Sequence, residues 1–74
     1  MPHVTLKLYI GRSEDEKRRI ADAVAQALIA SAGVSDASVS VSVEDVEPSA
    51  WPDVYRDEII GKPDTLFRKP GYVM

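Results

Sequence analysis

The sequence of 74 residues contains no cysteine and one histidine. Without cysteine the chain cannot be cross-linked by disulfides, and a single histidine without thiols does not supply the ligands of a structural zinc site, so we expect no metal. A chain this short buries only roughly 60% of the surface that its unfolded form exposes. The remaining support for so small a core is association with further copies, so we predict one domain over residues 1–74 that forms a homo-oligomer.

An excess of positive charge and long apolar runs are also missing. Nine Lys and Arg against twelve Asp and Glu give a formal net charge of −3, the wrong sign for neutralising phosphates or binding an anionic lipid surface. No apolar run approaches the roughly 20 residues of a transmembrane helix, and the N-terminus has neither the basic nor the apolar region of a signal peptide. We therefore expect a soluble, cytoplasmic protein with no nucleic-acid and no membrane partner.

The first half of the sequence has the pattern of a strand followed by a helix. Residues 3–10 alternate as in a half-buried strand, with one apolar face made of Val4, Leu6, Leu8 and Ile10. Ser13 and Glu16 have the spacing of a capping box, which predicts a helix that begins there and ends at Gly33. Spacings of three and four residues predict that its buried face contains Ile20, Ala23, Val24, Ala27, Leu28 and one of Ser31 and Ala32.

A second strand is predicted over residues 38–44, where Val39, Val41 and Val43 alternate with polar side chains. Two strands joined by a helical crossover should be parallel, and the helix should cover the valine face. The serine-bearing face or the strand edges should then meet another copy of the chain. The predicted fold class is α/β (α+β), a β-α-β unit with parallel strands, a short C-terminal helix and a tail.

The C-terminal part begins with a turn at residues 48–50. A short helix should follow, with Pro52 tolerated in its first turn and Gly61 at its end. The tail carries four side chains that are too apolar to be left in water, namely Phe67, Tyr72, Val73 and Met74. We expect this tail to pack on a neighbouring subunit.

Few residues are available for chemistry, and Pro2 is the most unusual of them. No catalytic triad, metal-binding spacing or phosphate-binding loop is indicated, and the paired carboxylates are typical of helix N-termini and solvated faces. Removal of Met1 would leave Pro2 as a free secondary amine at the start of a strand. Because α-amino groups titrate at about pH 7.7–8.0 and desolvation beside a cation disfavours their protonated form, this amine could act as a base at neutral pH. The dipeptide alone is more typical of an ordinary chain start.

Pro2 is part of a wider pattern. It is followed by residues 11–17 (GRSEDEK), by the alternating second strand and by an aromatic residue, Trp51. This combination resembles the tautomerase superfamily, specifically the 4-oxalocrotonate tautomerase group, over nearly the whole chain. His3, residues 47–51 and residues 69–72 are similar to the small bacterial tautomerases that form dimers in place of the usual hexamers, so a homodimer is favoured and a hexamer is the alternative.

The resemblance implies a cofactor-free isomerase, a keto–enol tautomerase with a tautomerase-like β-α-β fold and a small carboxylate substrate. It implies that Pro2 is catalytic and that its amine moves a proton between the oxygen and carbon ends of an enol. The arginine that binds a substrate carboxylate falls at Arg12, and the aromatic wall of the pocket falls at Trp51. Without this context Arg12 is typical of an exposed loop cation and Trp51 of a core or interface anchor.

The chain departs from the family pattern at one substrate-binding position, where the second arginine falls at Ser40. A second substrate carboxylate then has no partner unless Lys7, Arg56 or an arginine of a neighbouring subunit supplies one. We therefore expect enols of 2-oxo acids with one carboxylate, such as enol-phenylpyruvate, to be better substrates than dicarboxylates. His3, beside the predicted base, could orient substrate, but its polar strand position is more typical of an exposed or interface residue.

Two other functions are compatible with the same residues. A dehalogenase or hydratase of unsaturated acids would use a protonated Pro2 as an acid, but it needs a residue that activates water, and none stands out. A non-enzymatic oligomerisation or binding module would have kept the fold and lost the chemistry, which the missing second arginine allows.

Overall fold

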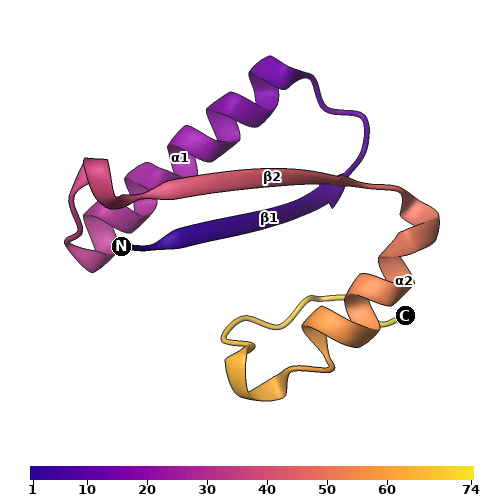
Figure 1. Ribbon diagram of the computed structural model, residues 1–74. Coiled ribbons are helices and arrows are strands. Elements are labelled where there is room, and N and C mark those ends of the chain that lie inside the picture. The colour runs from indigo at the N-terminus through magenta and orange to yellow at the C-terminus, as the bar shows by residue number, and fades with distance from the viewer.

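The computed structural model describes residues 1–74 as two parallel strands, a long helix between them in sequence, and a C-terminal helical segment with a tail (Figure 1). The elements are strand β1 (His3–Tyr9), helix α1 (Glu14–Ala32), strand β2 (Ser40–Val46) and helix α2 (Trp51–Val54). The strands form one parallel pair in which Val4 lies opposite Val41. The predicted β-α-β unit is confirmed.

The ends of α1 follow from local chemistry. The Ser13 side chain accepts a hydrogen bond from the Glu16 backbone N–H at 3.1 Å, as predicted for the first half of a capping box. At the other end Gly33 has a φ of 68°, and its N–H donates to the Ile29 carbonyl oxygen. Because a side chain rarely adopts this left-handed conformation, a glycine ends the helix where the sequence predicted.

The buried face of α1 differs from the prediction. Its half-buried apolar positions are Ile20, Ala21, Val24, Ala25, Leu28 and Ile29, whereas Ala23 and Ala27 are exposed in this single chain. The prediction followed the alanines and missed Ile29. Burial stabilises in proportion to apolar area, and an isoleucine side chain has more apolar area than an alanine methyl group. The helix is therefore rotated so that Ile29 is half-buried.

The second strand begins two residues later than predicted. Residues Asp36–Ser38 form a 3-10 turn in which the Ser38 hydroxyl donates to the Ser35 carbonyl oxygen at 2.8 Å. Serine side chains bond nearby backbone groups readily, so this local turn competes with strand pairing and delays β2 until Ser40.

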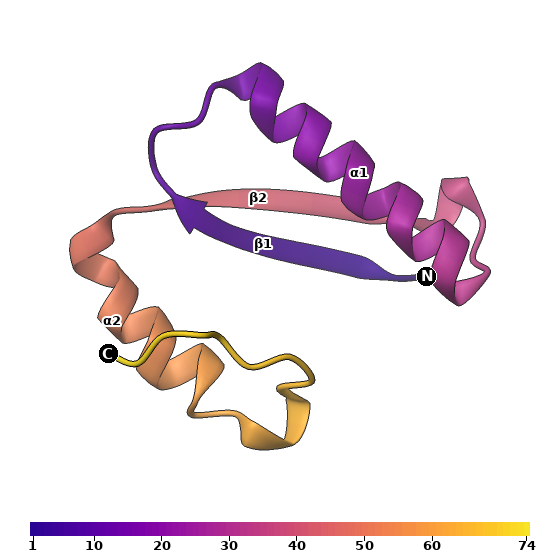
Figure 2. The same ribbon diagram turned by 180° about the vertical axis from the view of Figure 1, so that it is seen from behind.

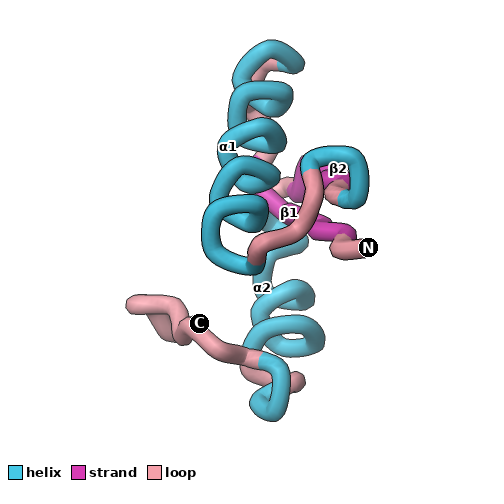
Figure 3. Tube along the Cα trace, turned by 90° about the vertical axis from the view of Figure 1, so that its left-hand side faces the viewer, coloured by secondary structure: helices cyan, strands magenta, loops and turns pink.

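Helix α1 covers one face of the strand pair, whereas His3, Thr5 and Ser40 on the other face are exposed. α1 packs on the face that carries Val41 and Val43, where Lys17 Nζ lies 3.1 Å from Asp45 Oδ2. α2 and the tail lie on the opposite side of the strands (Figure 1, Figure 2), and the end-on view shows the strand pair between the two helices (Figure 3). The predicted cover of the valine face by the helix is confirmed.

The C-terminal segment forms the predicted short helix with an unpredicted wider turn. A 3-10 turn over Pro48–Ala50 leads into α2, which continues as a π-helical turn over Tyr55–Ile59. A Cβ added at Gly61 would lie 2.3 Å from the Arg56 carbonyl oxygen. Only a glycine therefore allows the chain to leave the helix so tightly.

The single chain is open and has little interior. Tyr55 is its only buried residue, and its accessible surface is 5554 Å², against about 4,500 Å² for a compact monomer of this mass. Its radius of gyration is 13.7 Å, against about 11 Å for a compact domain of this length. None of the helices combines the length and apolar character needed to cross a membrane.

Candidate active site

A pocket of about 510 Å³ opens at the carboxyl end of β1. Its lining comes from β1, the loop before α1, the start of α2 and the C-terminal tail, through Lys7, Leu8, Tyr9, Arg12, Trp51, Tyr72 and Met74. Its volume lies within the range of sites for small organic ligands. Two of the predicted site residues, Arg12 and Trp51, are therefore placed in one pocket.

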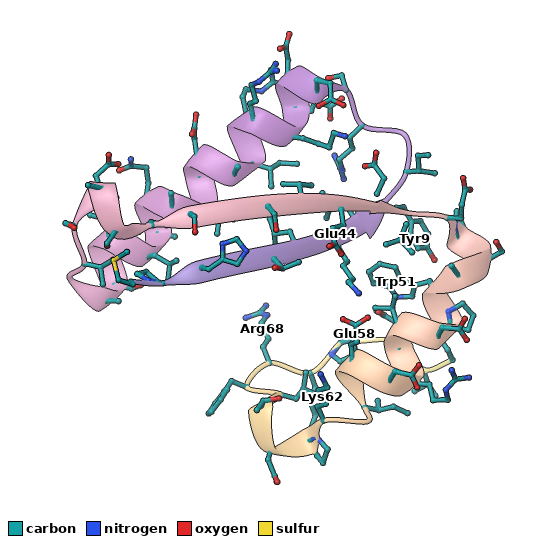
Figure 4. All side chains as sticks on the ribbon, in the orientation of Figure 1. Tyr9, Glu44, Trp51, Glu58, Lys62 and Arg68 are labelled. Atoms are coloured by element: carbon teal, nitrogen blue, oxygen red, sulfur yellow. The ribbon has the colours of Figure 1, made fainter.

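Trp51 is held in place by two tyrosines. Its ring packs edge-on against Tyr9, with centroids 5.3 Å apart and planes at 82°, and its indole N–H donates to the Tyr72 hydroxyl at 2.8 Å. Figure 4 shows Tyr9 and Trp51 against one another at the end of the strands. Tyr72 in turn packs against the buried Tyr55. The tail thus fixes the orientation of the aromatic wall, a role that the sequence did not reveal because Tyr72 lies 21 residues from Trp51.

Arg12 has weaker protein partners than Lys7, the other cation in the pocket. It follows Gly11, whose φ of 127° turns the chain out of β1. Its guanidinium lies 3.4 Å from Glu16 Oε2, and its side chain is half exposed. A single long contact leaves the donors on the other edge of the guanidinium free to bind a carboxylate in a bidentate manner.

Lys7 is bound more strongly by protein side chains than Arg12 is. Its ammonium donates to Glu58 Oε2 from the π-helical turn and lies 3.9 Å from Glu44 Oε2 on β2. The hydrogen bond to Glu58 raises the pKa of Lys7 above its ordinary value, so Lys7 is charged at neutral pH. Arg56, the other cation suggested for a second carboxylate, does not line the pocket; it pairs with Asp53 at 3.2 Å and with Asp57 at 2.8 Å.

Pro2 and Ser40 lie together at the other end of the strands. The Ser40 N–H donates to the Pro2 carbonyl oxygen at 3.2 Å, and the Ser40 hydroxyl is hydrogen-bonded to His3 Nδ1 at 2.7 Å. The other ring nitrogen of His3 lies 3.3 Å from the Thr5 hydroxyl. His3 is exposed, as its polar strand position predicted, and the strand register sets it opposite Ser40.

One chain does not bring all four predicted site residues together. Pro2 and Tyr9 are seven residues apart along an extended strand, a separation of about 23 Å. Arg12 and Trp51 lie at the Tyr9 end. A small substrate held by Arg12 and Trp51 therefore cannot reach Pro2 of the same chain. No group of three or more His, Asp or Glu side chains is placed to hold a metal ion.

The chain is similar to known proteins over most of its length. The family model described as "Tautomerase enzyme" matches residues 2–52, a range that includes all four predicted site residues. The chain is 44% identical to "Tautomerase PptA" of Pectobacterium carotovorum over 97% of both chains. It is 37% identical to a "Probable tautomerase" of Xylella fastidiosa over 97% of this chain and 89% of the relative.

Solved structures give the same result for the fold. A 4-oxalocrotonate tautomerase isozyme from Methylibium petroleiphilum superposes with a TM-score of 0.60 at 33% identity, over 62% of this chain and 74% of the other. TomN, a 4-oxalocrotonate tautomerase homologue of the tomaymycin biosynthetic pathway, superposes with a TM-score of 0.64 at 30% identity, over 68% and 77% of the two chains. These structures resemble part of the chain, whereas the PptA alignments cover nearly all of it.

Proposed function

The chain belongs to the tautomerase family, and from this premise we propose that it ketonises enols of 2-oxo acids with one carboxylate, without a cofactor and with the amine of Pro2 as the proton carrier. The chain is an isomerase of the tautomerase type, which leaves no support for a non-enzymatic module. We propose the substrate, the role of Pro2 and the assembly of the chain.

The observation that carries the proposal is the meeting of Arg12 and Trp51 in one pocket. The Arg12 guanidinium presents a planar pair of donors that matches a substrate carboxylate. The Trp51 indole, fixed by Tyr9 and Tyr72, presents an apolar surface to the remainder of the substrate. One charged anchor beside an aromatic wall suits an aryl-substituted 2-oxo acid.

The proton transfer can be written for the secondary amine of Pro2, which exists once Met1 is removed. The neutral amine takes the proton of the enol hydroxyl, and the C–O bond becomes a carbonyl. The electron pair of the C=C bond forms a bond at C3 with that same proton, which the protonated amine delivers. The amine returns the proton that it took, so it is neutral again at the end of the cycle. A base of this kind works best when its pKa lies near the working pH.

We propose that the proline comes from a second copy of the chain. Within one chain the strand separates Pro2 from Tyr9, which packs on Trp51 in the pocket, by about 23 Å. The excess exposed surface and the single buried residue support association. A symmetric dimer, in which each copy gives Pro2 to its partner's pocket, satisfies both observations with the smallest assembly; a hexamer is the other arrangement considered.

The test is an ultraviolet assay of enol-phenylpyruvate ketonisation, preceded by an intact-mass measurement that verifies the loss of Met1. A variant with one extra residue ahead of Pro2 converts the amine into an amide nitrogen, and we expect kcat to fall by about 100-fold or more. Unchanged circular dichroism and oligomeric state in the variant would exclude misfolding as the cause. Equal rates would remove the prolyl amine from the mechanism.

A dehalogenase or hydratase receives no support from this pocket. Such an enzyme needs a group that activates water, and the pocket lining supplied by one chain contains no carboxylate or histidine. Chloride release from a 3-chloroacrylate faster than enol-phenylpyruvate ketonisation would reverse this preference.

A further inference from the structure

We propose that Glu58 sets the substrate charge that the pocket accepts: it holds the Lys7 ammonium and so leaves Arg12 as the one cation available to a substrate carboxylate. The inference rests on the proposed function and deepens it, because it assigns the preference for one carboxylate to a particular side chain. The absence of the second arginine at Ser40 explains why one cation is missing. Glu58 explains why the cation that is present, Lys7, does not replace it.

The geometry places Lys7 where a second cation would be useful. Lys7 lines the same pocket as Arg12 and Trp51. Its side chain projects from the polar face of β1, directly opposite Glu44 in the strand register. It is about one-quarter exposed, with a side-chain accessibility of 28%. A lysine in this position is close enough to solvent and to the pocket to meet a bound ligand.

Two carboxylates lie close to the Lys7 ammonium. Glu58 accepts a hydrogen bond from Lys7 Nζ, and Glu44 lies 3.9 Å away. In Figure 4, Glu58 points from the C-terminal helical segment toward the strands and Glu44 lies above it on β2. One ammonium between two carboxylates has a local charge of −1, so a second substrate carboxylate would meet net repulsion there.

Glu58 is the stronger partner of the two. It makes the hydrogen bond, and that hydrogen bond is the largest cause of the raised pKa of Lys7. Glu44 is farther away and more exposed, with 54% of its side chain accessible against 42% for Glu58. Glu58 also lies outside residues 2–52, the part matched by the family model. The proposed control of substrate charge thus belongs to the C-terminal segment.

The experiment compares kcat/KM for two enols, enol-phenylpyruvate with one carboxylate and 2-hydroxymuconate with two. Glu58→Gln keeps an oxygen that can accept the hydrogen bond from Lys7 but removes the negative charge. We expect the dicarboxylate-to-monocarboxylate ratio of kcat/KM to rise roughly tenfold or more, mainly through a lower KM for the dicarboxylate, because like charges at a binding site act against the wrong ligand. A role of Glu58 in folding alone would lower both activities together.

Three further variants make the result specific. Lys7→Met combined with Glu58→Gln should return the ratio to the wild-type value or below, because the released cation is gone. Glu47→Gln makes the same change in net charge at an exposed side chain outside the pocket and should leave the ratio within about twofold of wild type. Arg68→Gln, added to Glu58→Gln, tests the tail cation that points toward the strands in Figure 4; loss of the gain here, but not with Lys7→Met, would overturn the assignment.

The outcomes separate the inference from the function on which it rests. If the wild-type protein turns over neither enol, the proposed function fails. If it turns over enol-phenylpyruvate and Glu58→Gln leaves the ratio unchanged, the role of Glu58 fails and the function stands. Glu44→Gln should shift the ratio in the same direction by a smaller factor, and it decides the question if Glu58→Gln does not fold.

Discussion

Arg12 and Lys7 line one pocket but differ in how strongly other side chains bind them. Arg12 has one long contact with Glu16 at 3.4 Å, whereas Lys7 is bound by Glu58 and lies near Glu44. A cation with weak protein partners gives up little when it binds a ligand, and a cation with strong partners must first lose them. At the residue scale, we therefore expect substrate binding to depend on Arg12.

Replacement of Arg12 by glutamine should reduce kcat/KM for enol-phenylpyruvate roughly 10- to 100-fold, which is the loss of one charge-assisted hydrogen-bonded pair. The loss should appear mainly in KM, because the carboxylate is bound equally in the ground state and in the transition state. Arg19→Gln is the matched control, since it removes one positive charge from the exposed face of α1. Similar losses in both variants would mean that net charge, and not a specific contact, is responsible.

At the scale of elements, the π-helical turn after α2 holds the pocket together. It contains the buried Tyr55, which packs against Tyr72, and Glu58, which binds Lys7. Gly61 follows this turn closely, and a Cβ there would clash with the Arg56 carbonyl oxygen. A change in this backbone should therefore move the tail, the helix and the strand face relative to one another.

Gly61→Ala should lower the free energy of unfolding by about 1–3 kcal/mol, because the added methyl group forces a backbone shift. Gly71→Ala is the control in the same segment, since nothing lies within 4 Å of a Cβ at that position. Urea denaturation followed by circular dichroism measures both variants. Equal stability of Gly61→Ala and the wild-type protein would show that the turn relaxes without cost.

The elements that the sequence predicted well are those specified by nearby residues. The α1 ends depend on Ser13 and Gly33, and strand alternation with a helical crossover predicts a parallel pair. The start of β2 and the buried face of α1 were predicted less well, because a serine turn and the area of Ile29 compete with simple periodicity. The ion pair of Lys7 with Glu58 joins residues 51 positions apart, so no local pattern could indicate it.

At the scale of the whole molecule, the proposed sharing of the site between copies rests on the length of β1. Arg12 and Trp51 were predicted as site residues from the resemblance, and the structure places them in one pocket. Pro2, predicted from the same resemblance, lies at the far end of the strand beside Ser40. The position of a catalytic group that comes from another copy depends on assembly, which the pattern within one chain does not specify.

Complementation between two impaired variants, assayed with enol-phenylpyruvate well below the wild-type KM, tests this arrangement. The variant blocked at Pro2 and Arg12→Gln are unfolded together and refolded as a mixture. If each site combines Pro2 of one copy with Arg12 of its partner, hybrid dimers carry one intact site, and roughly a quarter of the wild-type activity should return. The same proteins mixed without unfolding serve as the control. A refolded mixture that stays inactive while hybrids are detected by native mass spectrometry would contradict the shared site.

The tyrosine-held Trp51 has a practical consequence for measurement. The chain contains one tryptophan, and its indole lines the pocket and bonds the Tyr72 hydroxyl. Intrinsic fluorescence excited at the indole band therefore comes from the pocket alone, without background from other tryptophans. Ligand titrations, stopped-flow binding and the docking of the tail can all be followed through this natural optical reporter, with no label attached to the protein.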